Sequence, residues 1–297
     1  MRVLIVGCGY IGLPLGARLI REGHEVFGLR RNPEAGPELL AAGIHPLFAD
    51  ITRPEELKKL PAGFDWVVHC VAAGGVMDNY QETYFEGTSR LLEWLSRHPP
   101  RKLVYTSSTS VYGQNDGAVV DESSPAAPEA ETSKILVATE NLLLRAANAR
   151  PPAPVIPAII LRVAGIYGPG RGHGFKLFLR SQARIDGEGV RFMNMIHRDD
   201  VGGCIRAALH AGRPGEIYNA VDDEPVTQRH FYEWLAATLG KPLPPVEPDS
   251  PSRRRAITNK RVNNAKLRAE LGYTFQFPDF RAGYTAEMAR LKGAGRM

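Results

Sequence analysis

Hydrophobic and polar positions follow two alternating periods along the first half of the chain. Short runs rich in β-branched residues stand between longer stretches whose apolar residues have helical spacing; the runs are VLIVG, HEVFGL, IHPLFAD, WVVHCVA and KLVYTSS. This alternation predicts β-α-β units and a parallel sheet. After the proline-rich break ARPPAPVIP, the run AIILRVAGIYG is consistent with a sixth strand.

Local signals mark where the predicted helices begin and end. The helices are expected over residues 11–21, 32–42, 52–60 and 80–97, from residue 134 to about 149, and around 264–271. Gly23 stands where the first of them should stop, and Asn32 followed by Pro33 is typical of an N-cap and a first helical turn. Thr52 with Glu55 has the spacing of a capping box. Beyond residue 168 the pattern changes to glycine-rich loops and short helices.

The composition is that of an ordinary globular protein. Of 297 residues, 43% are hydrophobic and 23% charged, which argues against disorder, collagen and coiled coil. No apolar stretch approaches a membrane span of about 18 residues, and the start MRVLIVGCGYIG has no signal-peptide layout. We therefore predict a cytoplasmic protein that makes no membrane contact.

Charge adds little to this picture. The formal net charge is +5, but the clear basic cluster, residues 253–255, is too short for a nucleic-acid stripe and lacks interleaved aromatic residues. We predict no nucleic-acid partner. The same three arginines could anchor an anionic substrate or could form a solvated basic loop.

Neither the cysteines nor the histidine-aspartate segment predicts a metal site. Cys8, Cys70 and Cys204 lie far apart, so we expect reduced, buried thiols rather than a disulfide framework or a zinc site. His197 stands close to Asp199 and Asp200. Either aspartate is well placed to cap the helix that should run to residue 210, and no further ligand set is apparent. We favour the structural role and predict no metal.

A glycine-rich motif gives the first functional signal. Gly7, Gly9 and Gly12 form G-x-G-x-x-G directly after the strand RVLIV and before a helical pattern. The first glycine permits a tight turn, the second lets the backbone approach a diphosphate, and the third lets helix and sheet pack closely. The helix N-terminus then favours the anion. The alternative is a glycine-rich turn without a ligand.

The end of the second strand predicts which dinucleotide is bound. An acidic residue about twenty positions after the motif would bond the ribose 2′-hydroxyl of NAD, whereas arginine would meet the 2′-phosphate of NADP. This chain has Arg30 and Arg31 there and no acid. We predict NADP(H), with a solvated arginine pair as the alternative.

At TSSTSVYG the chain resembles the extended short-chain dehydrogenase/reductase superfamily, of the NAD-dependent epimerase/dehydratase type. The resemblance continues through Asp50 and Ile51, Lys134, the segment RVAGIYGPG at 162–170, IHRDDV at 196–201 and IYN at 217–219. It implies a Rossmann doubly wound parallel sheet with a smaller C-terminal α/β substrate domain. The Rossmann domain would comprise residues 1–167, with 196–222 returning to it, and the substrate domain 168–195 and 223–297.

The resemblance also implies catalytic roles. Enzymes of this superfamily use Ser or Thr to bond the substrate oxygen, Tyr as acid or base, and Lys to hold the nicotinamide ribose. Ser108 and Lys134 match by position, but Ala130 stands where the tyrosine is expected. The chain is therefore similar to the atypical, tyrosine-lacking subgroup, whose members are mostly of unassigned function.

Three residues are candidates to replace the missing tyrosine. Tyr84 lies on the helix expected near the cofactor, although a packed core tyrosine is the competing interpretation. Tyr112 in the VYG turn is better explained as structural, and Glu131 beside a lysine should ionise and donate poorly. We name Tyr84 with Ser108 and Lys134 as the catalytic candidates.

These inferences lead to two hypotheses about function. The candidate cofactor-binding residues are Gly7, Gly9, Tyr10, Ile11, Gly12, Arg30, Arg31, Asp50, Ile51 and Lys134. The first hypothesis is an NADP(H)-dependent oxidoreductase-like enzyme acting on a small carbonyl or sugar-like substrate, which can be neutral or anionic. The second is a catalytically silent NADP(H)-binding sensor or assembly module. The sequence leaves a homodimer open.

Overall fold

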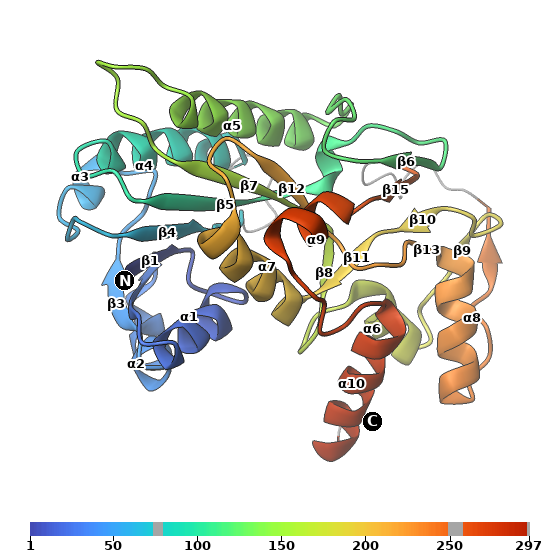
Figure 1. The fold of residues 1–297 in the computed structure, drawn as a ribbon. Helices are drawn as coiled ribbons and strands as arrows, with labels where there is room; N and C mark the ends of the chain where they lie inside the picture. The colour runs from blue at the N-terminus through green and yellow to red at the C-terminus, as the bar shows by residue number, and fades with distance from the viewer. Residues whose placement is uncertain (74–79, 249–257, 296–297) are drawn as a thin grey trace.

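The computed structural model describes residues 1–73, 80–248 and 258–295. The arginines at 253–255 lie outside these residues. Seven parallel strands form the main sheet in the order β12-β7-β5-β4-β1-β2-β3 (Figure 1). Their bounds are β1 Arg2–Val6, β2 Glu25–Arg30, β3 His45–Phe48, β4 Trp66–His69, β5 Lys102–Ser108, β7 Ala158–Val163 and β12 Ile217–Ala220.

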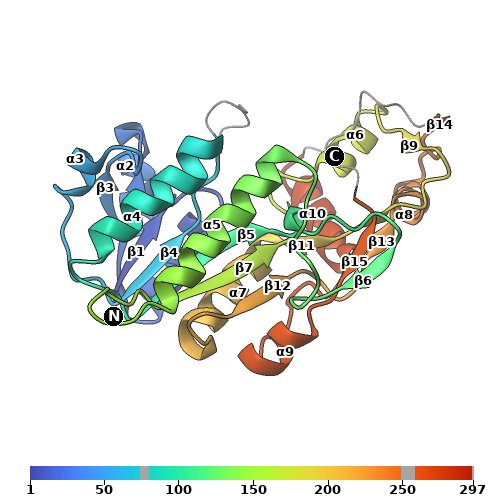
Figure 2. The same cartoon turned by 90° about the horizontal axis from the view of Figure 1, so that it is seen from above.

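Helices cover both faces of this sheet. Successive strand residues point to opposite sides, and both sides carry apolar residues that must be buried. On one face, Val3 and Ile5 of β1 pack with residues of α1, α2 and α7; on the other, Leu4 packs with α3, α4 and α5 (Figures 1 and 2). The helix bounds are α1 Gly12–Arg21, α2 Gly36–Ala41, α3 Pro54–Leu57, α4 Gly87–Leu95, α5 Glu131–Ala147 and α7 Arg198–Ala211. The predicted Rossmann doubly wound sheet is confirmed.

The second half of the chain builds a separate apolar cluster beside the carboxyl end of the sheet. Phe231 and Phe280 are at its centre, and Tyr167 and Tyr284 stack with ring centroids 4.5 Å apart. Its helices are α6 His173–Leu179, α8 Gln228–Leu239 and α10 Phe280–Gly293, seen together in Figure 1. Five short strands lie in the same part of the chain: β8 Gly165–Tyr167, β9 Ile185–Asp186, β10 Phe192–Met193, β11 Met195–His197 and β13 Val226–Thr227.

Some segments of the later chain pack back onto the first half. The strand β15 (Lys260–Val262) pairs in parallel with β6 (Ala118–Val120), and α9 (Ala265–Leu271) adds Leu267 and Leu271 to the core under the sheet. β14 (Val246–Glu247) pairs with β9. Three short turns remain: η1 Pro33–Ala35, the π-helical η3 Gln81–Glu86, and η4 Thr109–Val111. Among the helices that the structure describes, none is long and apolar enough to cross a membrane.

The predicted helix signals have mixed outcomes. Asn32 caps the turn that begins at Pro33, since its side chain accepts the N–H of Glu34, and Gly23 has the positive φ of 84° that ends α1. The predicted Thr52–Glu55 capping box is wrong. The helix begins one residue later than the box requires, so Arg53 is at the N-cap, and its side chain makes no capping bond. Thr52 instead donates its N–H and hydroxyl to the Asp50 carboxylate.

The predicted cap of α7 is also corrected. His197, not an aspartate, occupies the N-cap, and its Nδ1 accepts the N–H of Asp199 at 3.2 Å. Asp200 is fully buried and accepts the Tyr273 hydroxyl together with the N–H groups of residues 276 and 277. A tertiary partner therefore takes the carboxylate that sequence alone assigned to the helix end.

Candidate functional site

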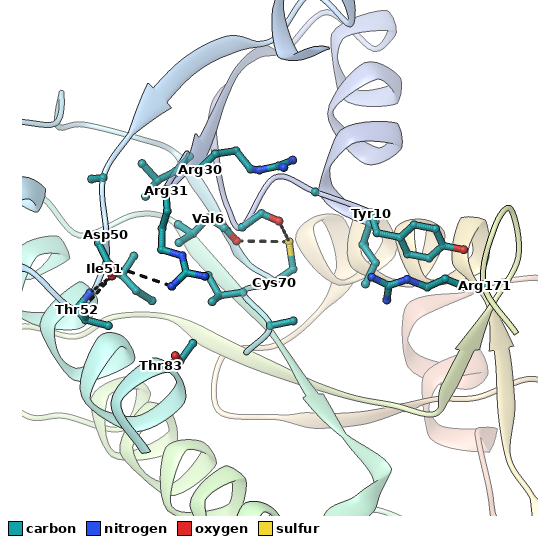
Figure 3. A pocket seen from close by; sticks show the side chains of 17 residues that line it. Val6, Tyr10, Arg30, Arg31, Asp50, Ile51, Thr52, Cys70, Thr83 and Arg171 are labelled. Atoms are coloured by element: carbon teal, nitrogen blue, oxygen red, sulfur yellow. Dashed lines mark hydrogen bonds and ion pairs between the residues drawn. The ribbon is translucent and has the colours of Figure 1, made fainter. Parts of the chain in front are cut away.

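The candidate site is a cavity at the carboxyl ends of β1, β2, β3 and β4, where a doubly wound fold binds its ligands. Figure 3 shows its lining. The lining residues are Val6, Gly7, Gly9, Tyr10, Ile11, Leu29, Arg30, Arg31, Ala49, Asp50, Ile51, Thr52, Cys70, Val71, Ala72, Thr83 and Arg171. Eight of the predicted cofactor-binding residues are among these seventeen.

The glycine-rich loop forms a cradle that side chains would fill. Gly7 has φ of 81°, and a Cβ built there would lie 2.7 Å from the backbone nitrogen of Val71. At Gly12, which begins α1, a Cβ would lie 2.8 Å from the Ile5 side chain. The loop therefore needs glycine at both positions, and its close backbone approach fits a diphosphate group.

The thiol within the loop is not set up for redox chemistry. Cys8 is fully buried, and burial raises the pKa of its thiol to about 12. Cys70 is also buried, and its Sγ lies 3.3 Å from the carbonyl oxygen of Gly7. Both thiols are free and protonated near neutral pH, as is expected of packed cysteines.

The two arginines at the end of β2 have different partners. Arg30 donates from Nη1 to the carbonyl oxygen of Cys8 at 2.8 Å and lies 3.8 Å from Glu38. Arg31 is 64% exposed, and its Nη1 lies 4.0 Å from the Asp50 carboxylate across the cavity. Arg30 thus braces the glycine-rich loop, whereas Arg31, among the residues that the structure describes, keeps most of its donors free for a ligand.

Asp50 and Ile51 form the wall opposite the glycine-rich loop. One carboxylate oxygen of Asp50 accepts both bonds from Thr52, and the other oxygen faces Arg31. Ile51 is 5% exposed and packs so closely on Gly87 that a Cβ there would lie 2.8 Å from it. This wall is fixed by its own turn and by α4.

Ser108 and Lys134 lie outside the lining of the cavity in the part of the chain that the structure describes. Ser108 ends β5, and its Oγ accepts the N–H of Ser110 at 3.1 Å. Lys134 is 52% exposed and bonds Glu131 at 2.7 Å. The Ser133 hydroxyl, next to Lys134, donates to the Ser110 hydroxyl at 3.1 Å, so the start of α5 adjoins the turn after Ser108.

Tyr84 lies closer to the cavity. It sits in η3 directly after Thr83, which lines the cavity, and its hydroxyl accepts the backbone N–H of Ala73 at 3.3 Å. Its ring packs on Tyr80 with centroids 4.5 Å apart. The other two candidates are elsewhere, since Tyr112 is buried with its hydroxyl on Asn219, and Glu131 is exposed.

The structure reveals a buried ion pair between α5 and β7. Arg162 bonds Glu140 through two nitrogens, with the shortest contact at 2.7 Å, and their side chains are only 5% and 2% exposed. Ser107 donates its hydroxyl to the same carboxylate at 2.6 Å. This group ties β5, β7 and α5 together immediately behind Ser108. Sequence reasoning did not identify it.

One further cluster has ligand types suited to a metal. Atoms of Glu22, His24 and His210 lie within 4.8 Å of one another at the opposite end of the sheet from the cavity. One Glu22 oxygen already meets Arg18 at 3.4 Å and Arg206 at 3.3 Å. These cations offset the carboxylate charge that a divalent ion would need, so the cluster is better explained as a surface ion-pair network.

Together, the fold and the cavity define a dinucleotide-binding protein of the Rossmann class, with an NAD(P)-type cofactor. The family model of the "NAD dependent epimerase/dehydratase family" matches residues 3–220, and the chain belongs to this family. The predicted resemblance to the extended short-chain dehydrogenases/reductases is therefore confirmed.

Several known proteins are similar over most of their length. "Protein YeeZ" of Escherichia coli (strain K12) is 29% identical over 287 residues, covering 94% of this chain and 97% of YeeZ. "dTDP-6-deoxy-L-talose 4-dehydrogenase (NAD(P)(+))" of Kitasatospora kifunensis is 29% identical, covering 92% of this chain and 90% of that protein. The structure of DesIV, a dTDP-glucose 4,6-dehydratase from Streptomyces venezuelae with NAD and TYD bound, matches with a TM-score of 0.83 at 23% identity, covering 99% and 97% of the chains. This last similarity supports the fold alone.

Proposed function

We propose that the protein is an NADP(H)-dependent oxidoreductase of the epimerase/dehydratase type, which acts on a small carbonyl or sugar-like substrate without the family's usual tyrosine. The observation that carries the proposal is the position of Arg31 in the cavity wall beside the braced glycine-rich loop, with few partners among residues 1–73, 80–248 and 258–295. An arginine at this point of the second strand suits the 2′-phosphate of NADP. An anionic substrate is part of the same proposal.

Each predicted site residue has a separate role in binding or catalysis. The glycine-rich loop offers backbone N–H groups to the diphosphate, and Arg31 binds the 2′-phosphate, with Arg30 keeping the loop in place. Asp50 and Ile51 form the adenosine wall. When bound in this cavity, the dinucleotide would be the source or acceptor of the hydride. Ser108 holds the substrate oxygen, Lys134 the ribose, and Tyr84 is the candidate proton donor.

Cofactor preference is tested by titrating the protein with NADPH and NADH and following the nicotinamide fluorescence. Arg31→Ala should weaken NADPH binding about tenfold and leave NADH almost unchanged, because one charge-assisted contact to an exposed phosphate is lost. Arg30→Ala should weaken both dinucleotides, since it releases the loop. An unchanged NADPH:NADH ratio in Arg31→Ala would refute the 2′-phosphate assignment.

A second function, a catalytically silent NADP(H) sensor or assembly module, is favoured by Ala130 and by the outward position of Lys134. The two are separated with NADPH deuterated at the nicotinamide C4 and a cytosolic metabolite extract. Deuterium in a product identifies an enzyme and its substrate. In an enzyme, Lys134→Ala should lower turnover, whereas in a module it should change only cofactor affinity and partner response. Binding without label transfer supports the module.

A further inference from the structure

Arg171 is distant in sequence from the other residues that line the cavity. The other sixteen come from residues 6–83, whereas Arg171 lies in the loop between β8 and α6. It therefore reaches the cavity from the second half of the chain and lies beside Tyr10, at the end away from Asp50 and Ile51 (Figure 3). No local pattern in the sequence indicates this approach.

The aromatic ring of Tyr10, in the glycine-rich loop, holds the Arg171 guanidinium in position. The Arg171 Cζ lies 4.1 Å from the ring centroid of Tyr10, and the Arg198 Cζ lies 5.2 Å from the same centroid. Figure 3 shows the Arg171 and Tyr10 side chains together at one end of the cavity. Cation–π contact fixes a guanidinium over a ring face without using its hydrogen-bond donors, which remain available to a ligand.

The backbone of the Arg171 loop is also fixed. The Arg171 N–H donates to the carbonyl oxygen of Gly168 at 2.9 Å, and Gly168 and Gly170 both have positive φ, of 134° and 72°. The N–H of Gly170 donates to Glu287 on α10 at 3.4 Å. The loop thus presents Arg171 from a turn anchored to the second half of the chain.

Within the described residues, no carboxylate pairs with the Arg171 guanidinium. The nearby Glu287 carboxylate is bonded by Arg290 at 2.7 Å, and Asp199 by Arg198 at 2.9 Å. Arg171 therefore leaves positive charge at the Tyr10 end of the cavity, whereas the charge of Arg198 is offset by Asp199. A planar guanidinium with free donors is suited to a phosphate oxygen pair.

We propose that Arg171 binds the diphosphate bridge of the dinucleotide at the Tyr10 end of the cavity, together with the backbone N–H groups of the glycine-rich loop and with Tyr10 as its platform. This rests on the proposed function, which supplies the dinucleotide. A cofactor held by Arg171 and by the glycine-rich loop would also join the β8–α6 loop to the Rossmann half whenever it binds. An anionic group on the substrate is the other source of the same chemistry.

The test compares Arg171→Gln and Arg171→Lys with the wild type by calorimetric titration. The matched control is Arg180→Gln, which removes an exposed arginine at the end of α6. The probes are NADPH, which contains the diphosphate, and adenosine 2′-monophosphate, which does not. Melting curves of the free proteins check that each variant is folded.

Arg171→Gln should bind NADPH about tenfold more weakly and adenosine 2′-monophosphate as the wild type does, while Arg171→Lys should recover part of the loss. Arg180→Gln should match the wild type. NADPH binding that is unchanged in Arg171→Gln overturns the proposal. A wild-type protein that binds neither NADPH nor NADH is a different result, because it refutes the proposed function itself.

Discussion

Replacing Glu140 by alanine should destabilise the whole protein. The change leaves the buried Arg162 guanidinium, 5% exposed, without its bidentate partner, and it takes the acceptor from the Ser107 hydroxyl. Removing one partner of a buried ion pair costs about 3 to 5 kcal/mol. Since domains are stable by about 5 to 15 kcal/mol, the variant should lose between about a fifth and all of its free energy of unfolding.

The assay is urea unfolding followed by circular dichroism and by tryptophan fluorescence. If the charge left in the core is the cause, the double variant Glu140→Leu with Arg162→Leu should be more stable than either single variant, because neither charge is then buried alone. A loss below about 1 kcal/mol in Glu140→Ala, with an unchanged denaturant slope, would refute the reasoning. So would two single losses that simply add in the double variant.

Three other predictions address the loop, the proton donor and acid stability. Gly7→Ala should abolish dinucleotide binding in titrations, because its Cβ would lie 2.7 Å from a backbone nitrogen; Gly23→Ala, with a similar φ of 84° but nothing within 4 Å, should keep binding. Tyr84→Phe should lower turnover by about 10² to 10⁴ with NADPH affinity kept, and equal turnover would exclude it as the donor. Burial lowers the pKa of His69 to about 4. As the pH falls below 6.5, His69 of the unfolded chain takes up a proton before His69 of the folded chain does, so the free energy of unfolding decreases between pH 6.5 and pH 4. Unfolding curves of His69→Leu should lack this part of the pH dependence. Curves of His98→Leu, which removes an exposed histidine, should keep it.

Local patterns predicted the sheet and eight of the residues that line the cavity, because both are encoded within a few residues. Strand periodicity, the glycine spacing and the two arginines at the end of β2 need no tertiary information. The contact of Arg171 with Tyr10 joins residues 161 positions apart, so no local pattern could reveal it. The same holds for Asp200, whose bond to Tyr273 removed it from the predicted cap.

The position of Lys134 shows a subtler limit. Motif spacing places a lysine on α5, but not on a particular face of it. At about 100° per residue, Ser133 lies about 20° from Glu140 around the helix and Lys134 about 120° from it. Glu140 and Ser133 are both buried, and Ser133 bonds the turn after Ser108. The inward group at the start of α5 is therefore a hydroxyl, and Lys134 must leave Glu131 and swing around the helix to hold a ribose. If the lysine does so, NADPH should weaken its bond to Glu131, and Glu131→Gln should tighten cofactor binding in a titration; unchanged affinity in both Glu131→Gln and Lys134→Ala would remove the lysine from the site.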